Sequence, residues 1–333
     1  MTAADVGEVP LVQQAQLRRD TRSRIADNGI LVAFALLVVG LVLASPTFRT
    51  LDNVLSVGEQ SATLAVAAFA MTLVLVCGSI DLSVGAVASA AGVVAALRLS
   101  EGDPAWLAVL VGLLLATAFG ALNAAVVVFG RVPSFIVTLA TFYVAQGLSL
   151  SLTGGQTVSF DAPGFRSTFA TADLLGVPVA LAWAVLVLLA LGFLLHRSRT
   201  GADLFAVGGD EASARMLGLP VDRGRFLVLT LSGALMGLVA MILIARIGNA
   251  RSDGGIGLEF DAIAAVVIGG TSFAGGRGSL LRTVVGVLFI GVLNNGLALL
   301  NVDFNTQQVV KGVLVIAAVL LDRWARGARR AAT

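Results

Sequence analysis

The sequence predicts an all-α polytopic membrane protein with about ten transmembrane helices. Of its 333 residues, 57% are hydrophobic and only 13% are charged, which is about half the charged fraction of a soluble domain. The mean hydropathy is +0.95. Apolar runs recur along the whole chain, and several approach the roughly 20 residues that one crossing of a bilayer needs. Composition and patterning therefore place most of the chain inside lipid.

The residue types narrow the possible activities. Cys77 is the only cysteine and His196 the only histidine, so the chain forms no internal disulfide and we expect no His/Cys metal site. Lys311 is the only lysine and is followed by glycine, whereas a Walker A loop needs Gly-Lys-Ser/Thr. If ATP drives this protein, another polypeptide must bind it. One histidine also leaves no Ser-His-Asp set and no HExxH motif, so we do not expect an enzyme.

The first five spans follow a polar tail. Residues 1–28 carry four arginines and are interpreted as a cytoplasmic tail, because they are too long and too mixed for a signal peptide. Pro46 ends the first apolar run, and short turns containing glycine or proline separate the later runs. We expect spans at residues 29–44, 54–77, 83–97, 105–129 and 134–152.

The second half begins after a polar stretch at 153–177, which we expect to be an outer loop. A second polar stretch at 196–225 holds five arginines and is predicted to be cytoplasmic. The eighth apolar run is short for a full crossing. We expect spans at residues 178–195, 226–247, 258–270, 280–300 and 306–321, followed by a basic cytoplasmic tail at 322–333.

The placement of arginine predicts the orientation. With ten spans, the segments that would face the cytoplasm hold 15 arginines and the outer segments hold 5. An excess of basic residues is typical of cytoplasmic loops. We therefore expect both termini in the cytoplasm and a single transmembrane domain at 29–321 between the two tails.

Residues 78–85 (GSIDLSVG) separate two apolar runs with a carboxylate that has glycines on both sides. Lipid cannot satisfy free backbone groups, so such a break must be buried in protein or line a wet cavity. Asp81 has the chemistry of a helix N-cap, and Ser83 lies beside it. A helix end followed closely by a new helix start is typical of a substrate or gating region in a transporter.

A similar acidic helix start occurs in the second half. The sequence LEFD, ending at Asp261, precedes a run of small residues, much as IDLS at 80–83 does in the first half. The two lie on opposite membrane faces in the expected topology, as an inverted repeat requires. The alternative is that two small-residue helices look alike by chance. By the same reasoning, Asp261 would cap the helix that it begins.

Four carboxylates lie in or near the expected spans: Glu59, Asp81, Glu259 and Asp261. An ionisable group at that depth is costly and usually faces protein or water. These residues either belong to a polar pathway or, for Asp81 and Asp261, cap broken helices. The two roles can coincide.

The polar stretch at 196–225 contains a short helix with clear ends. Asp210 can cap its first turn, and Glu211 and Arg215 form an i, i+4 pair. Gly218 suits a left-handed stop, and the proline two residues later prevents continuation. The helix would expose Ala212, Met216 and Leu217, which give it a surface that can dock. The alternative is an ordinary loop helix.

Taken together, these motifs resemble the permease subunits of ribose-type ABC sugar importers. The likeness covers about residues 28–322, and it is specific in combination although each motif is weak alone. The matching motifs are GSIDLSVG at 78–85, VPSFIVTL at 132–139, the loop at 208–218, AAVVIGGTS at 264–272, GGRGS at 275–279 and GVLNNGL at 291–297.

The resemblance implies a type II ABC importer fold in the bacterial cytoplasmic (inner) membrane. It also implies three kinds of partner: a second permease copy, identical or not; cytoplasmic ATPase domains, which would bind ATP and Mg²⁺; and a periplasmic or lipid-anchored sugar-binding protein. Besides these and membrane lipid, we expect no cofactor on this chain and no nucleic acid. The short loop helix would be the coupling helix that seats in the ATPase, through Gly208, Gly209, Asp210, Glu211, Ala212, Arg215 and Gly218.

We therefore expect transport of a monosaccharide or a similar neutral polar solute by alternating access. Amides, hydroxyls and aromatic rings should line the path, and the outer loop should meet the binding protein. The candidate path residues are Asp81, Ser83, Asn123, Thr138, Thr141, Phe142, Gln146, Asn294 and Asn295. The alternative is an ion-coupled secondary transporter, which would need a titrating carboxylate and no ATPase. The sequence does not name the sugar.

Overall fold

The computed structural model describes residues 31–174 and 176–330, so the predicted tail at 1–28 lies outside the described residues. An apolar helix at Leu31–Ala44 and a 3-10 turn, η1 (Pro46–Arg49), lead into the helices of the first half. These are α2 (Leu51–Val76), α3 (Val84–Ser100), α4 (Ala105–Phe129) and α5 (Ser134–Thr153). The bounds of α4 are those that the sequence predicts.

The middle and second half of the chain are also mainly helical. The middle forms α6 (Pro163–Arg166), the π-helical turn η2 (Ser167–Thr171), α7 (Val179–Arg197), α8 (Arg199–Gly209) and α9 (Glu211–Met216). The second half forms α10 (Val221–Ile247), α11 (Leu258–Ile268), α12 (Leu280–Leu299) and α13 (Phe304–Arg330). The predicted basic tail at 322–333 is instead a continuation of α13, as far as the described residues extend.

Strands are few and very short in the described part of the chain. β1 (Val158–Ser159) pairs with β4 (Asn249–Ala250) in an antiparallel ladder that places Val158 opposite Ala250. β2 (Asp173–Leu174) pairs in the same way with β3 (Val177–Pro178). The first ladder joins the predicted outer loop to the segment that follows α10.

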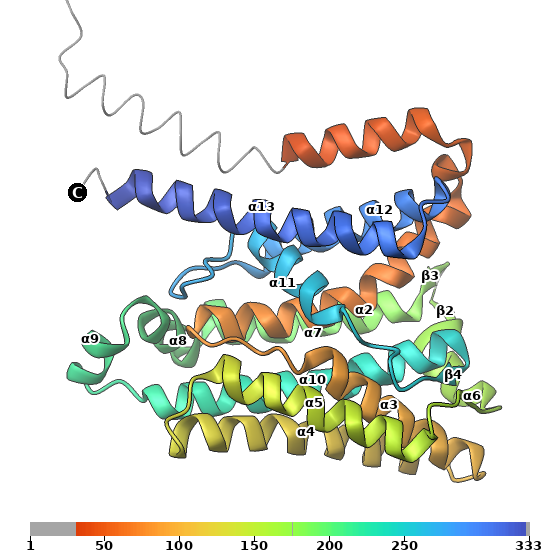
Figure 1. Cartoon of the computed structure of the whole chain (residues 1–333), viewed down its shortest axis with the longest axis horizontal. Helices are drawn as coiled ribbons and strands as arrows, with labels where there is room; N and C mark the ends of the chain where they lie inside the picture. Colours follow the sequence, from red (N-terminus) through yellow and green to blue (C-terminus); the bar gives the residue numbers. More distant parts are fainter. Residues whose placement is uncertain (1–30, 175, 331–333) are drawn as a thin grey trace, which may run out of the picture.

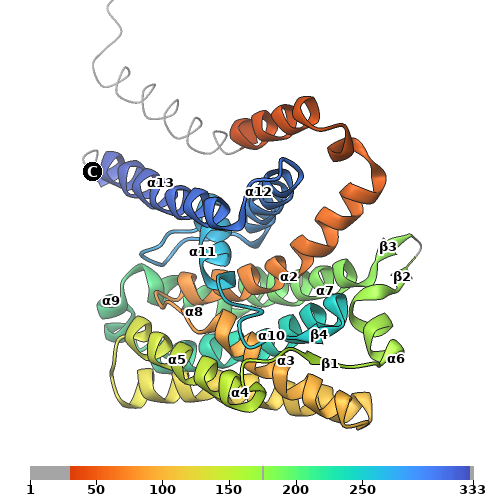
Figure 2. The ribbon, with the colours of Figure 1, turned by 45° about the vertical axis from the view of Figure 1, so that its right-hand side comes forward.

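The long helices lie side by side and run roughly along the long axis of the molecule (Figure 1). α2, α7 and α10 occupy the middle, with α4 and α5 on one side and α12 and α13 on the other, as Figure 2 also shows. α8 and α9 lie at one end of the bundle, together with the far end of α13. α6 and the short strands lie at the opposite end.

The core is built around α2 and α10. These two helices pack against each other, and each also packs against a helix of the other half, α2 against α12 and α10 against α4. Glycines allow α10 and α4 to approach closely. A Cβ atom added at Gly233 of α10 would lie only 2.7 Å from the Cα atom of Gly120 of α4, so a larger residue would force the helices apart. Such backbone-to-backbone contact is how helices associate in lipid, and it explains the GxxxG pattern that begins at Gly233.

Six of the described helices are long and apolar enough to cross a bilayer: α2, α4, α5, α7, α10 and α12. The helix at Leu31–Ala44 and α3 are apolar but shorter, and α11 has only 11 residues. Both α3 and α11 begin near the middle of the bundle, after a segment that runs back into it from one end (Figure 1 and Figure 2). Their shortness follows from that starting point.

Candidate functional site

The chain reverses direction at the end of α2. Gly78 has a φ of +75°, and its N–H donates to the Leu75 carbonyl at 2.9 Å, while the Ser79 N–H donates to the Val74 carbonyl at 3.0 Å. This pair of bonds is a Schellman motif, which needs a left-handed residue and favours glycine. The next residues run back between the helices as an irregular segment without helix or strand, which we call the re-entrant segment (79–83).

The side chain of Asp81 is the centre of a buried polar network. Its carboxylate accepts hydrogen bonds from the Ser83 N–H at 3.0 Å, the Ser83 hydroxyl at 2.6 Å and the Ser232 hydroxyl at 2.8 Å. The network continues from Ser83 through Asn123 to Thr141, at 3.0 and 2.6 Å. These five residues, which we call the Asp81 network, come from the re-entrant segment, α4, α5 and α10, and all are buried.

Two hydroxyls of α5 satisfy the backbone of the re-entrant segment. The Ile80 N–H donates to the Ser134 hydroxyl at 3.0 Å, and the Leu82 N–H donates to the Thr138 hydroxyl at 3.1 Å. Irregular backbone at membrane depth must be paired in this way. The segment is therefore held on both sides, by Asp81 toward α10 and by these hydroxyls toward α5.

Two predicted helix caps are wrong. The N-cap residue of α3 is Ser83, so Asp81 lies two residues before it and does not cap the helix itself. The N-cap residue of α11 is Gly257, so Asp261 lies inside the first turn. The expected spans at 83–97 and 258–270 begin within one residue of α3 and α11, so only the residues named as caps are wrong. Asp261 instead pairs with Lys311 of α13 at 2.9 Å.

The remaining predicted path residues do not join the Asp81 network. Asn295 pairs with Asn53 of α2, and the Asn294 amide lies 3.4 Å from the Asp261 carboxylate. Phe142 and Gln146 lie half-buried on α5, where Phe142 packs edge-on against Tyr143. The structure thus gathers four of the nine candidates, Asp81, Ser83, Asn123 and Thr141, in one network, with Thr138 beside it. It places Asn294 beside Asp261 and Asn295 beside Asn53.

Three residues of these clusters escape sequence reasoning: Asn53, Ser134 and Ser232. Each is a single polar residue next to or within an apolar run, and a buried polar side chain in a span usually finds a partner. Their position in or beside an apolar run predicts that each has a hydrogen-bond partner, but it does not predict on which helix the partner lies. Ser232 and Asn53 are the most informative of the three, because each joins the first half of the chain to the second.

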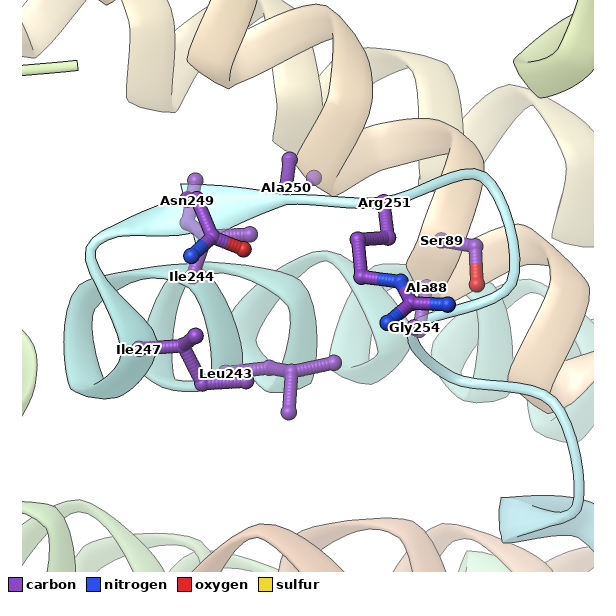
Figure 3. Close-up of a pocket in the computed structure, with 10 residues that line it drawn as sticks. Ala88, Ser89, Leu243, Ile244, Ile247, Asn249, Ala250, Arg251 and Gly254 are labelled. Carbon is purple, nitrogen blue, oxygen red and sulfur yellow. The ribbon is translucent and has the colours of Figure 1, made fainter. Parts of the chain in front are cut away.

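A small pocket lies on the side of α3, at the end of the bundle that carries β4 (Figure 3). It has a volume of about 30 Å³ and is lined by Ser89 and Arg251 among mainly apolar residues. Small-molecule sites begin at roughly 300 Å³, so this pocket is not a sugar site. The Ser89 hydroxyl instead accepts a hydrogen bond from the Gly255 N–H at 2.8 Å, which fixes the segment after β4 to α3.

The short helix α9 forms as the sequence predicts. The Asp210 carboxylate accepts from the N–H groups of Ala212 and Ser213, at 3.0 and 3.2 Å. Gly218 has a φ of +74°, and its N–H donates to the Arg215 carbonyl, which closes the C-terminal end. The hydrogen bonds from Ser213 and Ala212 hold the pKa of Asp210 below its usual value.

Ion pairs fix α9 to the start of α10. Glu211 pairs with Arg225 at 2.6 Å and with Arg215 at 3.1 Å, and Arg215 also pairs with Asp222 at 2.6 Å. Partial burial alone would raise the pKa of Glu211, but the hydrogen bonds and charges of the two arginines lower it. The helix is thus anchored on one side, while Met216 beside it is 81% exposed.

α9 and the residue after it expose three apolar side chains. Leu217 follows Met216 and is 78% exposed, and Ala212 is exposed as well. A rigid, anchored helix end with bare apolar side chains is suited to fit a groove on another protein. The predicted exposure of Ala212, Met216 and Leu217 is confirmed, while their docking on a partner stays a prediction.

Comparison with known proteins identifies the family. Residues 50–319 match the family described as branched-chain amino acid transport system / permease component. The chain is 37% identical to the ribose import permease protein RbsC of Escherichia coli strain K12, over 91% of this chain and 95% of the relative. It is 38% identical to the D-allose transport system permease protein AlsC of the same strain, over 84% and 86%. It is 33% identical to the L-arabinose transport system permease protein AraH, also of that strain, over 92% and 94%. The chain therefore belongs to this family of transport-system permease components.

Proposed function

We propose that this chain is the permease subunit of an ABC importer and carries a monosaccharide, or a similar neutral polar solute, across the cytoplasmic membrane. The observation that carries the proposal is its similarity to three relatives named for ribose, D-allose and L-arabinose, along most of each chain. The family description names branched-chain amino acids, but the individual relatives are named for sugars, and they are the closer guide to the cargo.

The energy source would be a separate cytoplasmic ATPase, which would hold the ATP and Mg²⁺. Lys311, the only lysine, pairs with Asp261 inside the helical bundle, so it is not available to a nucleotide. The anchored helix α9, with Met216 and Leu217 bare, is the feature best suited to seat in such a partner. Alternating access would follow when the partner moves this helix.

The proposed path lies near the re-entrant segment. In the described part of the chain, the side chains of Asp81 and Ser83 form their hydrogen bonds with other members of the Asp81 network. Because these side chains are buried and hydrogen-bonded to one another, no space for a sugar remains between them. We therefore assign the arrangement to a closed state, in which Asn123 and Thr141 would exchange their mutual hydrogen bond for bonds to sugar hydroxyls when the helices separate. Phe142 and Gln146 would face the solute from the same helix as Thr141.

The topology we propose has ten spans, both termini in the cytoplasm and two inverted halves. The packing pattern supports it: α3 contacts α4 and α5 in the first half, while α11 contacts α12 and α13 in the second. α2 and α10 occupy matching central positions, and each is followed by a segment that returns to the middle of the bundle. A second copy of this chain or a related one, and an outer binding protein that meets residues 153–177, complete the assembly.

The experiment is reconstitution. The chain is co-expressed with an ATP-binding subunit and a solute-binding protein of a ribose-type importer, placed in liposomes, and tested for uptake of labelled ribose, D-allose and L-arabinose. We expect uptake of at least one sugar that needs all three components and ATP. Accumulation by the chain alone, driven by a proton or sodium gradient, would instead establish the ion-coupled alternative, for which the partly buried Asp261–Lys311 pair would be the first residues to examine.

A further inference from the structure

Three chain segments that are far apart in the sequence meet backbone to backbone at the end of the bundle that carries α9. They are the end of α2 at Gly78, the end of α8 at Gly208 and Gly209, and the loop between α11 and α12 at Gly275 and Gly276. We call these five glycines the glycine junction. The loop and α8 lie together at this end in both views (Figure 1 and Figure 2).

Three of the five glycines, Gly208, Gly275 and Gly276, leave no room for a side chain. A Cβ atom at Gly208 would lie 1.8 Å from the Val76 carbonyl oxygen and 2.7 Å from the Gly276 nitrogen. One at Gly275 would lie 2.5 Å from the Gly208 oxygen, and one at Gly276 would lie 2.5 Å from the Gly209 Cα atom. Since the obstructing atoms are all backbone, they cannot rotate away as a side chain could.

A hydrogen bond closes the junction. The Gly276 N–H donates to the Val76 carbonyl at 3.0 Å, so one of the carbonyls left free at the end of α2 is satisfied by the distant loop. Cys77, which follows, is fully buried. A Cβ atom added at Gly224 of α10 would lie 3.9 Å from its sulfur, which places the start of α10 against the same point.

The junction lies between the two features already described. On one side, Gly209 is followed directly by Asp210, which caps α9. On the other side, Gly78 leads within three residues to Asp81 and its network. Any displacement of α9 that moves the end of α8 must therefore push on the end of α2, because the two backbones touch without a deformable side chain between them.

We propose that the glycine junction transmits the displacement of α9 to the re-entrant segment, with Gly208 as the positioning residue that keeps the two backbones in contact. The inference rests on the proposed function of α9 as the dock for an ATPase. It assigns the junction a role in coupling beyond the packing of three loops. The loop that carries Gly275 and Gly276 leads to α12, so the same junction passes the displacement to both halves of the bundle.

The native cysteine provides a reporter. Cys77 is the only cysteine of this chain, and a buried thiol reacts with N-ethylmaleimide only when the structure around it opens. The measurement is the rate of Cys77 alkylation, read by mass spectrometry of its peptide, in the reconstituted complex without nucleotide and after trapping with ATP and vanadate. We expect the two rates to differ severalfold in the wild-type complex.

Gly208→Ala tests the contact, and Gly192→Ala is the matched control. Gly192 lies in α7, and a Cβ atom there meets nothing within 4 Å. We expect Gly208→Ala to lower transport per ATP hydrolysed about tenfold and to remove the nucleotide dependence of Cys77 alkylation, while the assembled complex still hydrolyses ATP. The control should behave as the wild type does in both measurements.

The outcomes separate the two proposals. If the wild-type complex transports no sugar with ATP, the proposed function fails. If it transports sugar but Cys77 reacts at one rate with and without nucleotide, the junction proposal is overturned while the function stands. Normal coupling in an assembled Gly208→Ala complex overturns it as well. If that variant does not assemble, the wild-type alkylation rates alone decide.

Discussion

Asn53 on α2 and Asn295 on α12 exchange two side-chain hydrogen bonds, at 3.1 and 2.9 Å. Both side chains are buried, and the two residues are 242 positions apart. Each amide supplies one donor and one acceptor to the other, so the pair joins the two halves of the chain without help from water. Asn295 was a candidate for the solute path, but in this structure its side chain holds α12 to α2. We call the Asn53–Asn295 pair the clamp.

The first prediction concerns this clamp. Asn295→Ala leaves the Asn53 amide without its partner in a buried site, and we expect the free energy of unfolding to fall by about 1–2 kcal/mol. The double variant Asn53→Leu, Asn295→Leu should recover part of that loss, because neither buried amide is left without its partner; the recovery is incomplete because the Phe48 carbonyl loses its bond from Asn53. The measurement is thermal unfolding in detergent. Asn305→Ala, at an exposed position of α13, is the control, and equal losses for it and Asn295→Ala would contradict the clamp.

The second prediction concerns Asp81. Asp81→Asn keeps one carbonyl oxygen for the Ser83 N–H, and its NH₂ can donate to the Ser232 hydroxyl in place of the bond that the carboxylate accepts. We therefore expect Asp81→Asn to keep much of the transport activity, whereas Asp81→Leu should lose it. Uptake is measured on complexes that assemble normally. Equal loss in both variants would show that the negative charge itself is needed, which a purely positioning carboxylate does not explain.

The two predictions show what the sequence could and could not supply. The ends of α9 were predictable because Asp210, the Glu211–Arg215 pair and Gly218 act within a few residues of one another. The partner of Asn295 was not, because an amide in an apolar helix looks the same whether it faces a solute or another helix. The Asp81 network lies between these cases: the sequence marks a polar break, but Ser232 is 151 residues away.

The residues that cap the helices show the same limit. The sequence places a helix break before the run that becomes α3, but it names Asp81 rather than Ser83 as the first capping position. For α11 it names Asp261, although the helix begins after Gly257, whose φ is +94°. The expected span at 258–270 begins where α11 does, so the sequence located the helix start but not the glycine that precedes it as the cap.

The third prediction concerns the ion pairs of α9. Glu211→Arg replaces its bonds to Arg225 and Arg215 with repulsion. We expect co-purification of the ATPase and sugar uptake to fall about tenfold or more, with little change in thermal stability, because exposed pairs contribute about 0.2–1 kcal/mol. Asp253→Arg, which breaks the Arg251 pair after β4, is the control. It should leave ATPase co-purification unchanged, and an equal loss there would contradict a local role for Glu211.

Acid should weaken the same anchor. The pKa values of Asp210 and Glu211 are lowered in the folded chain, so both groups stabilise the loop fully above their ordinary pKa of about 4. That contribution is lost as the pH falls through the lowered values. Hydrogen exchange of residues 210–219, corrected for the intrinsic effect of pH, should stay slow at neutral pH and rise only below about pH 4. A rise near neutral pH would contradict this account.

The fourth prediction concerns Gly218, whose left-handed conformation ends α9. A residue with a Cβ atom pays about 1–2 kcal/mol there, and asparagine tolerates the conformation better than alanine or valine does. We expect sugar uptake to fall in the order Asn, Ala, Val. Gly102→Val is the matched control, since Gly102 has a φ of +86° with open space around it in the turn after α3. Uptake as low in the control as in Gly218→Val would show that strain alone, and not the shape of the docking loop, causes the loss.

The fifth prediction compares one substitution at two sites. A Cβ atom at Gly85, near the start of α3, would lie 2.2 Å from the Glu259 carboxylate and 2.3 Å from the Gly255 carbonyl oxygen. At Gly147 of α5 it would meet nothing within 4 Å. Alanine normally stabilises a helix by about 0.5–1 kcal/mol relative to glycine, so Gly147→Ala should raise the thermal midpoint slightly. Gly85→Ala should lower it by an amount that corresponds to about 1–3 kcal/mol, the usual cost of overpacking.

Gly147→Ala and Gly85→Ala should change the thermal midpoint in opposite directions because only Gly85 lies where α3 contacts α11 in the middle of the bundle. One Glu259 oxygen accepts from the Gly257 N–H at 3.0 Å, and the other lies against Gly85 without a hydrogen-bond partner among the described residues. Glycine at position 85 therefore lets the two helix starts touch. A dye that fluoresces on reaction with Cys77, the buried lone cysteine, reports unfolding of both variants. If Gly85→Ala and Gly147→Ala had equal thermal midpoints, α11 could move away from α3 without loss of stability. That result would contradict the packing that holds the two halves together.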